Sequence, residues 1–107
     1  MKYKIIFSKT AEDDLREIAL YIVEHSNNVD LAINFVNGIR ETCKILEDFP
    51  ECGSVPQDRI LVCNGYRFLV YGNYLVFYVH KVEDDSVFIL SVVNSKQDYL
   101  RVIKRFI

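Results

Sequence analysis

The sequence predicts an α+β domain, in which two helices pack on one face of a mainly antiparallel sheet of about four strands. Apolar residues recur with a period near 3.6 in two segments of the N-terminal half. The C-terminal half holds three segments rich in Val, Ile, Phe and Tyr, separated by short turn signals. Strands that follow a pair of helices indicate α+β rather than alternating α/β architecture. At 107 residues, the chain is expected to form a single domain, residues 1–107.

The first predicted elements are a strand and a helix. Residues 2–7 are mostly apolar and favour a strand. Ser8 or Thr10 can cap the helix that follows, and Thr10 with Asp13 approximates a capping box. The helix lasts about four turns, since its apolar stripe is long: Ala11, Leu15, Ile18, Ala19, Ile22 and Val23. The polar residues between them, including Asp14, are expected to face solvent.

A second amphipathic helix follows a polar break at residues 25–28. Asp30 is a suitable N-cap, and Phe49-Pro50 ends the segment. Two such helices with a short loop predict an antiparallel hairpin. Gly38 within the second helix costs about 1 kcal/mol relative to alanine, and a close helix–helix approach would explain it.

The strands are predicted at residues 66–71, 74–81 and 86–93, after a short strand or extended approach at residues 59–63. Gly72-Asn73 and Asp84-Asp85 suit two-residue hairpin turns. The tail, residues 96–106, has helical spacing and predicts a short C-terminal helix. The element order is therefore β-α-α-β-β-β, with the sheet face opposite the helices partly open.

Strand pairing predicts which side chains share a surface. A two-residue turn at Gly72-Asn73 pairs Tyr71 with Tyr74, Leu69 with Val76, and Arg67 with Tyr78. A similar turn at Asp84-Asp85 places Ser91 opposite Tyr78, and Ile89 opposite His80. Phe68, Val70, Leu75 and Phe77 are the more apolar alternate set and are expected to form the core. The face away from the helices would then carry Arg67, Tyr71, Tyr74, Tyr78, His80 and Ser91. An arginine among tyrosines can hold a phosphate and stack on a base or peptide.

Composition excludes several classes of protein. No apolar run approaches the roughly 18 residues of a membrane span, and the N-terminus has no secretory pattern, so a cytoplasmic protein is expected. Cys43, Cys52 and Cys63 lack metal-site spacing, and we expect no metal and no cofactor. Residues 1–55 carry 6 basic and 10 acidic side chains. Residues 56–107 carry 7 basic and 5 acidic side chains, so the C-terminal half is weakly positive. A dedicated non-specific DNA binder would be far more basic.

Four segments of the chain carry a family resemblance. The first runs from Ser8 through Ala11, Asp14, Leu15 and Ile18 to Tyr21-Ile22; the second is Leu46, Phe49-Pro50 and Gly53. The third joins Gly65-Tyr66-Arg67 to the segment from Gly72 to Tyr78, and the fourth is residues 89–99. In this order they resemble the RelE/ParE superfamily of toxins from type II toxin–antitoxin systems, the plasmid stabilisation family. The resemblance implies the predicted fold, inhibition of growth, and a cognate antitoxin that neutralises the toxin in a hetero-oligomer.

The superfamily has two main branches with different targets. RelE-like toxins cleave mRNA on the ribosome, which would make Arg67, Lys96, Tyr99 and His80 the candidate catalytic residues. ParE-like toxins bind and poison DNA gyrase without hydrolysis, which would make Arg67, Tyr71, Tyr74, Tyr78 and Arg101 the candidate target-binding residues. A third reading is an inactive relative that only binds its antitoxin.

The resemblance favours the ParE-like branch. Active ribonucleases often have an arginine after the tyrosine that matches Tyr74, and here that position is Leu75. The closing segment is also poor in basic residues, with only Lys96 in residues 94–97. One arginine, one lysine and one histidine are few groups for phosphoryl transfer. We therefore expect a toxin that is not an enzyme.

Overall fold

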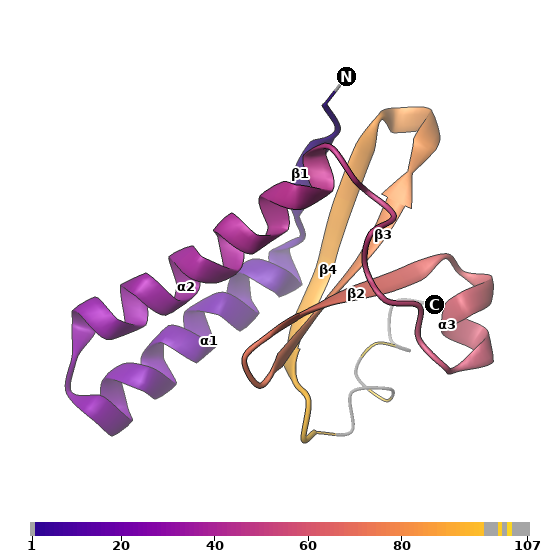
Figure 1. Cartoon of the computed structure of the whole chain (residues 1–107). Helices are drawn as coiled ribbons and strands as arrows, with labels where there is room; N and C mark the ends of the chain where they lie inside the picture. The colour runs from indigo at the N-terminus through magenta and orange to yellow at the C-terminus, as the bar shows by residue number, and fades with distance from the viewer. Residues whose placement is uncertain (1, 98–100, 102, 104–107) are drawn as a thin grey trace.

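A four-stranded sheet with the strand order β1-β4-β3-β2 is the centre of the fold (Figure 1). The computed structural model describes residues 2–97, 101 and 103. The strands are β1 (Lys4–Phe7), β2 (Tyr66–Tyr71), β3 (Tyr74–Lys81) and β4 (Ser86–Asn94). β1 pairs in parallel with β4, and the other two pairings are antiparallel. The predicted mainly antiparallel sheet is confirmed.

The helical hairpin consists of α1 (Lys9–Ser26) and α2 (Val29–Cys43), which continues into the 3-10 turn η1 (Lys44–Glu47). Ser8 caps α1 by accepting a hydrogen bond from the Ala11 amide at 3.0 Å. The predicted Asp30 cap of α2 is wrong. Asn27 has a left-handed backbone, φ 53°, which turns the chain at once, so that Asn28 caps α2 instead.

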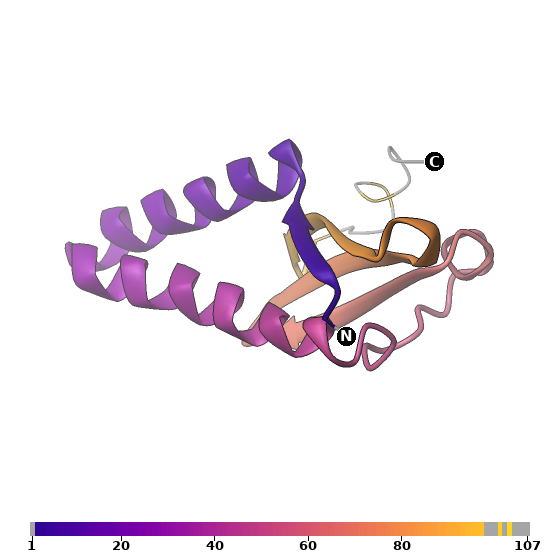
Figure 2. The ribbon, with the colours of Figure 1, turned by 90° about the horizontal axis from the view of Figure 1, so that it is seen from above.

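The hairpin extends past the end of the sheet. Figures 1 and 2 show both helices running away from the strands on the same side. The molecule is accordingly elongated, 43 × 32 × 21 Å. An ion pair between Arg40 and Glu12, at 2.8 Å, joins the two helices near the sheet. In the described part of the chain, no helix is both long and apolar enough to cross a bilayer.

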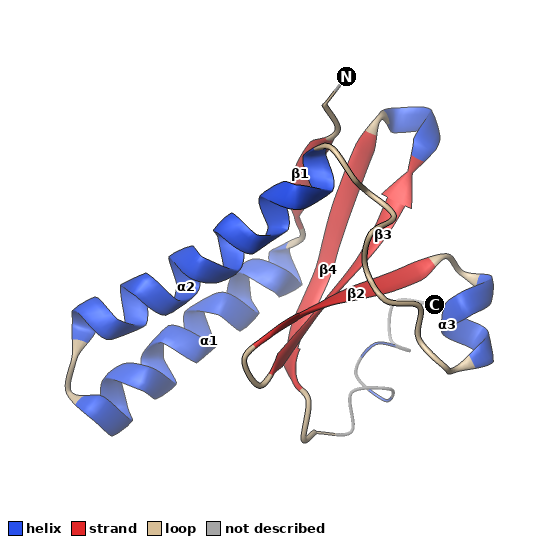
Figure 3. Ribbon diagram, in the orientation of Figure 1, coloured by secondary structure: helices blue, strands red, loops and turns tan. Residues whose placement is uncertain are grey.

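Residues 59–63 form a short helix, α3 (Arg59–Cys63), and not the extended segment that their composition predicts (Figure 3). Asp58 caps it by accepting hydrogen bonds from the Ile60 and Leu61 amides, at 2.9 and 3.2 Å. This local capping outweighs the strand preference of the branched side chains. The predicted tail helix lies mostly outside the described residues; Arg101 and Ile103 are helical.

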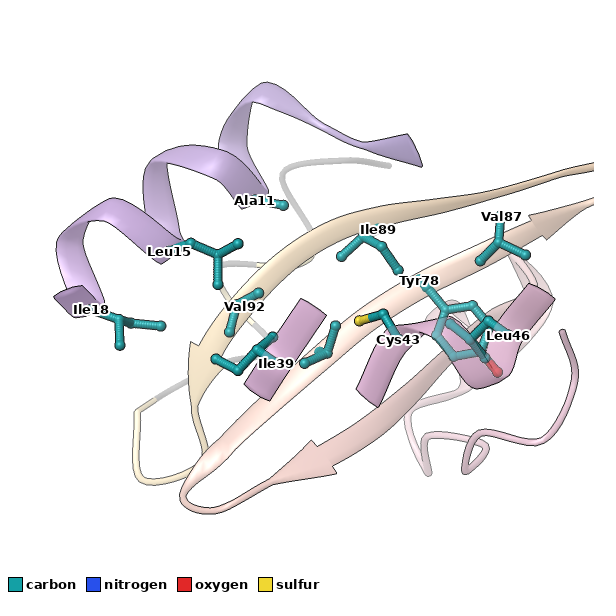
Figure 4. Packing of buried hydrophobic residues seen from close by; sticks show 11 residues of the cluster. Ala11, Leu15, Ile18, Ile39, Cys43, Leu46, Tyr78, Val87, Ile89 and Val92 are labelled. Carbon is teal, nitrogen blue, oxygen red and sulfur yellow. The ribbon is translucent and has the colours of Figure 1, made fainter. Parts of the chain in front are cut away.

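One core lies between the hairpin and the sheet (Figure 4). The helices contribute Leu15, Ile18, Ile39 and Cys43 to it, and Leu46 is contributed by η1. The sheet contributes Val76, Tyr78, Val87, Ile89 and Val92. Each of these side chains is at most 6% exposed. The first predicted stripe is therefore buried at Ala11, Leu15 and Ile18, whereas Ala19, Ile22 and Val23 are only half-buried.

A second core covers the opposite face of the sheet. Its buried members are Leu61, Tyr66, Leu75, Phe77, Val93 and Ile103. Leu61 is on α3 and Ile103 is in the tail, so elements from two parts of the chain close this face. The prediction of a partly open far face is wrong over these residues.

Gly38 on α2 permits a close approach of helix and sheet, not of helix and helix as the sequence suggested. A Cβ atom at this position would overlap the Tyr71 hydroxyl, which projects from β2. A side chain at position 38 would therefore require Tyr71 or α2 to shift. The cost of glycine within a helix is offset by this contact.

Cys43 should make the protein sensitive to alkaline pH. Burial raises the pKa of its thiol from 9.0 to about 12, although Arg40 opposes the shift. The folded state therefore keeps the thiol proton above pH 9, where the unfolded chain releases it. Stability is lost as pH rises from 9 towards 12, by about 1.5 kcal/mol at pH 10. Urea unfolding at pH 7 to 10 should show this loss, and Cys43→Ala should remove it. The exposed Cys63 is the control position, because Cys63→Ala should leave the pH dependence unchanged.

Candidate functional site

The predicted pairing of β2 with β3 is confirmed. Arg67 lies opposite Tyr78, Leu69 opposite Val76, and Tyr71 opposite Tyr74. The predicted orientation of these side chains is wrong, because Tyr78, Val76 and Leu69 belong to the core beneath the helices. Strand alternation separates two sets of side chains but does not say which set the helices cover. Here both faces are covered, and the more polar set lies under the hairpin.

The three tyrosines of this set differ in accessibility. Tyr78 is fully buried, so its side chain does not reach the surface of this fold. Tyr71 and Tyr74 are half-buried, and both present ring edges to Phe35 of α2, at centroid distances of 5.2 and 5.7 Å. They support the hairpin and retain part of their surface for a partner.

The predicted pairing of β3 with β4 is wrong in register. The connection is the 3-10 turn η2 (Val82–Asp84), followed by Asp85 in the left-handed region, rather than a two-residue turn. A bulge then lies between Phe77 and Tyr78. Ser91 consequently lies opposite Phe77, and Ile89 opposite Tyr78. Ser91 is fully buried and is not on an open surface.

Arg67 and Tyr78 both bind the backbone of Gly53. The Gly53 amide donates a hydrogen bond to the Tyr78 hydroxyl at 2.9 Å, and Arg67 donates from Nη1 to the Gly53 carbonyl at 3.1 Å. Burial raises the pKa of the Tyr78 hydroxyl, while the bond from Gly53 opposes that shift. We call this arrangement of Arg67, Tyr78 and Gly53 the Gly53 clasp.

His80 lies on the same strand face as Tyr78, two residues further along β3. Its ring packs edge-on against Tyr3, with centroids 4.7 Å apart. Its Nε2 atom is buried and has no hydrogen-bond partner among the described residues. His80 thus packs against Tyr3 with its Nε2 atom buried, while the residue as a whole is partly exposed.

Lys96 lies at the other end of the sheet. It follows β4, where Asn94 pairs with Tyr74 and the Ser95 amide donates to the Asn73 carbonyl. Tyr74 and His80 are six residues apart on β3, which corresponds to about 20 Å of strand. The predicted site residues therefore form two groups along the sheet. One group contains Arg67, Tyr78 and His80, and the other contains Tyr71, Tyr74 and Lys96. Arg101 is exposed, and Tyr99 lies outside the described residues.

A groove of about 1080 Å³ opens between the overhanging hairpin and the Lys96 end of the sheet. Apolar side chains of the helices form one wall: Ile18, Tyr21, Ile22, Leu31 and Phe35. The Gly72-Asn73 turn, Tyr74 and the end of β4 form the other. Asp14 and Glu17 on one side and Lys96 on the other give it charges of both signs. We call this the hairpin groove.

Asp14 fixes the inner end of the hairpin groove. Its Oδ2 accepts hydrogen bonds from the Ser91 hydroxyl at 2.6 Å and from the Val92 amide at 2.9 Å. The prediction that Asp14 faces solvent is wrong. The available signal was its position, three residues after Ala11 and four before Ile18, which places it beside the buried stripe.

The edge of β4 explains why a carboxylate is needed there. β1 covers β4 only from Ser86 to Ile89, so the following residues have no strand neighbour on that side. The Leu90 carbonyl accepts from the Ser8 hydroxyl at 2.8 Å, and the Val92 amide donates to Asp14. Side chains from the start of α1 thus replace the missing strand.

Comparison with known families decides the classification. A family model described as the ParE toxin of the type II toxin–antitoxin system parDE matches residues 5–99. The chain belongs to this family. No curated protein sequence matches it.

Solved structures of other members of the superfamily share the fold. A chain of the chromosomal ParDE system from P. aeruginosa is 19% identical with a TM-score of 0.72, covering 87% of this chain and 96% of that chain. A chain of the toxin–antitoxin complex RelBE2 from Mycobacterium tuberculosis is 24% identical with a TM-score of 0.57. The match covers 88% of this chain and 99% of that chain. An arginine-to-alanine double mutant of E. coli RelE in the free state is 16% identical with a TM-score of 0.67, and the match covers both chains completely.

The residues that carry the ParE-toxin resemblance have structural roles in this chain. Ser8 caps α1 and binds the edge of β4, and Asp14 binds the same edge two residues later. Gly53 and Arg67 meet in the Gly53 clasp. The described residues contain no group of three His, Cys, Asp or Glu side chains that could hold a metal ion. Among the described residues, those that carry the resemblance therefore join α1 to the edge of β4 and form the Gly53 clasp.

Proposed function

We propose that this ParE-family toxin arrests growth by binding DNA gyrase and poisoning it, without cleaving RNA. The observation that carries the proposal is the separation of the basic candidates. Arg67 and Lys96 lie at opposite ends of the sheet, and Arg67 is already bound to a backbone carbonyl. The family match supports the ParE-like branch in the same direction.

Cleavage of RNA by its own 2′-hydroxyl requires convergent groups. A base must reach the hydroxyl within about 3 Å, while cationic donors contact the same phosphate in the transition state. Arg67 lies opposite Tyr78, and Lys96 follows Asn94, the partner of Tyr74, so about 13 Å of strand separates their positions along β3. Arg67 is also directed at the Gly53 carbonyl. The Nε2 atom of His80 is buried, so this nitrogen would have to become accessible before it could take part in proton transfer. Binding to a protein target has no such requirement.

The same proposal includes a cognate antitoxin that docks in the hairpin groove. The P. aeruginosa relative is part of a ParDE system, and the M. tuberculosis one is a toxin–antitoxin complex. The groove has the apolar wall and mixed charged rim that suit an amphipathic helix or an extended segment. Phe35 on one wall and Tyr74 on the other would contact the apolar side of the antitoxin, and Lys96 would pair with one of its acidic residues.

Two parallel assays test the target. The purified toxin is added to a gyrase supercoiling reaction and to a ribosomal translation reaction with labelled mRNA. We expect loss of supercoiling with accumulation of gyrase-dependent DNA breaks, and intact mRNA. Arg59→Ala serves as a control variant, because Arg59 is exposed on α3 and outside the candidate site.

Cleavage of the mRNA with unaffected gyrase would contradict the proposal. Codon-phased cuts in the mRNA that disappear in Arg67→Ala would show a ribonuclease and refute the gyrase proposal. Inactivity in both reactions, together with binding of the protein encoded next to the toxin gene, would indicate an inactive relative. A protein that binds neither gyrase nor that neighbour would refute both parts of the proposal.

A further inference from the structure

The Arg67 side chain is engaged by the backbone of the same protein. It is half-buried, and its hydrogen bond at 3.1 Å goes to the carbonyl of Gly53, a residue of the loop between η1 and α3. Tyr78 holds the amide of the same residue from the neighbouring strand. The two side chains therefore fasten one glycine of this loop to β2 and β3.

Gly53 fits the clasp because it lacks a side chain. A Cβ atom at position 53 would lie 2.5 Å from the Tyr78 hydroxyl and 2.9 Å from the Phe68 carbonyl. The next residue, Ser54, forms two backbone hydrogen bonds with Phe68 of β2, at 2.8 and 3.0 Å. Four hydrogen bonds thus anchor two consecutive residues of the loop, Gly53 and Ser54, to β2 and β3.

An anchored loop with exposed apolar side chains is suited to binding. Phe49 is 62% exposed and Val55 is 51% exposed, on either side of the clasp. Glu51 and Cys52 between them are also exposed. Binding energy is concentrated in such apolar anchors when the backbone is preorganised, since little entropy is lost on contact. We call residues 49–55 the clasp loop.

The charge of this region indicates the kind of partner. Residues 45–58 contain four acidic side chains, Glu47, Asp48, Glu51 and Asp58, and no basic one. None of the described residues forms an ion pair with Asp48 or Glu51. Residues 49–55 carry Glu51 and no basic side chain, so the loop itself offers no cation to a nucleic-acid phosphate. A protein surface with basic and apolar side chains would be attracted.

We propose that Arg67 is a positioning residue, which acts through Gly53 to hold the clasp loop as the surface that contacts a basic region of the protein target. The inference rests on the proposed function, because it names the surface through which the toxin would engage that target. It assigns the direct contacts to Phe49, Glu51 and Val55. Arg67 and Tyr78 then have the same task from two adjacent strands.

The test combines growth arrest with hydrogen exchange at the Gly53 amide. Arg67→Ala and Tyr78→Phe should each speed this exchange and weaken growth arrest, and the double variant should be no worse than the poorer single one. Arg67→Lys should keep most of the activity, since one donor is enough for one carbonyl. Phe49→Ser and Val55→Ser should raise the toxin dose needed for arrest about tenfold or more and leave the Gly53 exchange rate unchanged. Arg59→Ala is the control, and thermal unfolding verifies that each variant folds.

Several results would overturn the inference. Arg67→Ala and Arg67→Lys that are both inactive, with Gly53 exchange unchanged and Tyr78→Phe fully active, would mean that Arg67 contacts the target directly. Full activity of Phe49→Ser and Val55→Ser would exclude the clasp loop. Growth arrest that depends on the loop while gyrase is unaffected would refute the proposed target and keep the inference. A wild-type chain that does not arrest growth would overturn both.

Discussion

Replacing Phe77 by alanine should lower the free energy of unfolding by about 3–5 kcal/mol. The Phe77 side chain is fully buried on the sheet face opposite the hairpin, and its ring packs against Phe68 with centroids 5.5 Å apart. Leu61 of α3 and Ile103 of the tail close over the same cluster. The alanine variant would leave a large cavity beneath these two elements. Urea unfolding monitored by circular dichroism measures the loss from the shift in midpoint.

A matched control lies on the neighbouring strand. Val70 is 59% exposed on β2, and Val70→Ala should change stability by no more than about 0.5 kcal/mol. If Phe77→Ala costs no more than this control, the far face is not a packed core in solution. The tail would then not cover the sheet at Ile103.

Most of the secondary structure could be predicted because it depends on local signals. The periodic apolar stripes of α1 and α2 and the turn at Gly72-Asn73 gave both helices and the pairing of β2 with β3. Errors arose where one residue decides a boundary. The left-handed backbone of Asn27 makes the loop between α1 and α2 shorter than expected. Asp58 caps residues 59–63, which therefore form the helix α3 although their β-branched side chains favour a strand. Their effect depends on backbone geometry that composition does not reveal.

The faces of the sheet could not be predicted, for a different reason. Alternation gives two sets of side chains, and the usual rule assigns the more apolar set to the helices. In this chain Leu61 of α3 and Ile103 cover Phe77 and Leu75, which removes the open face on which that rule depends. The arginine and tyrosines were correctly grouped, but they were placed on the wrong side of the sheet.

The pairing register of β3 with β4 could not be predicted, because two irregularities that determine it have no sequence signature. The turn η2 and the bulge beside Tyr78 together shift Ser91 from opposite Tyr78 to opposite Phe77. Long-range hydrogen bonds were equally hidden. Arg67 and Gly53 are 14 residues apart, and Asp14 and Ser91 are 77 apart. Each looks like an ordinary surface or turn residue until the fold brings its partner near.

Asp14→Ala should lower the free energy of unfolding by about 2–3 kcal/mol, because it leaves the Val92 amide and the Ser91 hydroxyl without their charged acceptor. The loss should also appear as faster hydrogen exchange at the Val92 amide. Asp13→Ala is the matched control on the same turn of α1. The Asp13 side chain is 47% exposed, and among the described residues it pairs with the exposed Arg16 alone. Its removal should cost about 0.5 kcal/mol or less.

Asp14→Asn separates the charge of this group from its geometry. The amide oxygen of asparagine can still accept from Ser91 and Val92, so most of the stability should return if shape matters more than charge. The contrast bears on the hairpin groove, because Asp14 joins α1 to β4 at its inner end. If the groove holds the antitoxin, Asp14→Ala should weaken that complex more than Asp14→Asn does, and Asp13→Ala should leave it unchanged. Equal weakening by Asp14→Ala and Asp13→Ala would mean that Asp14 does not determine the shape of the groove.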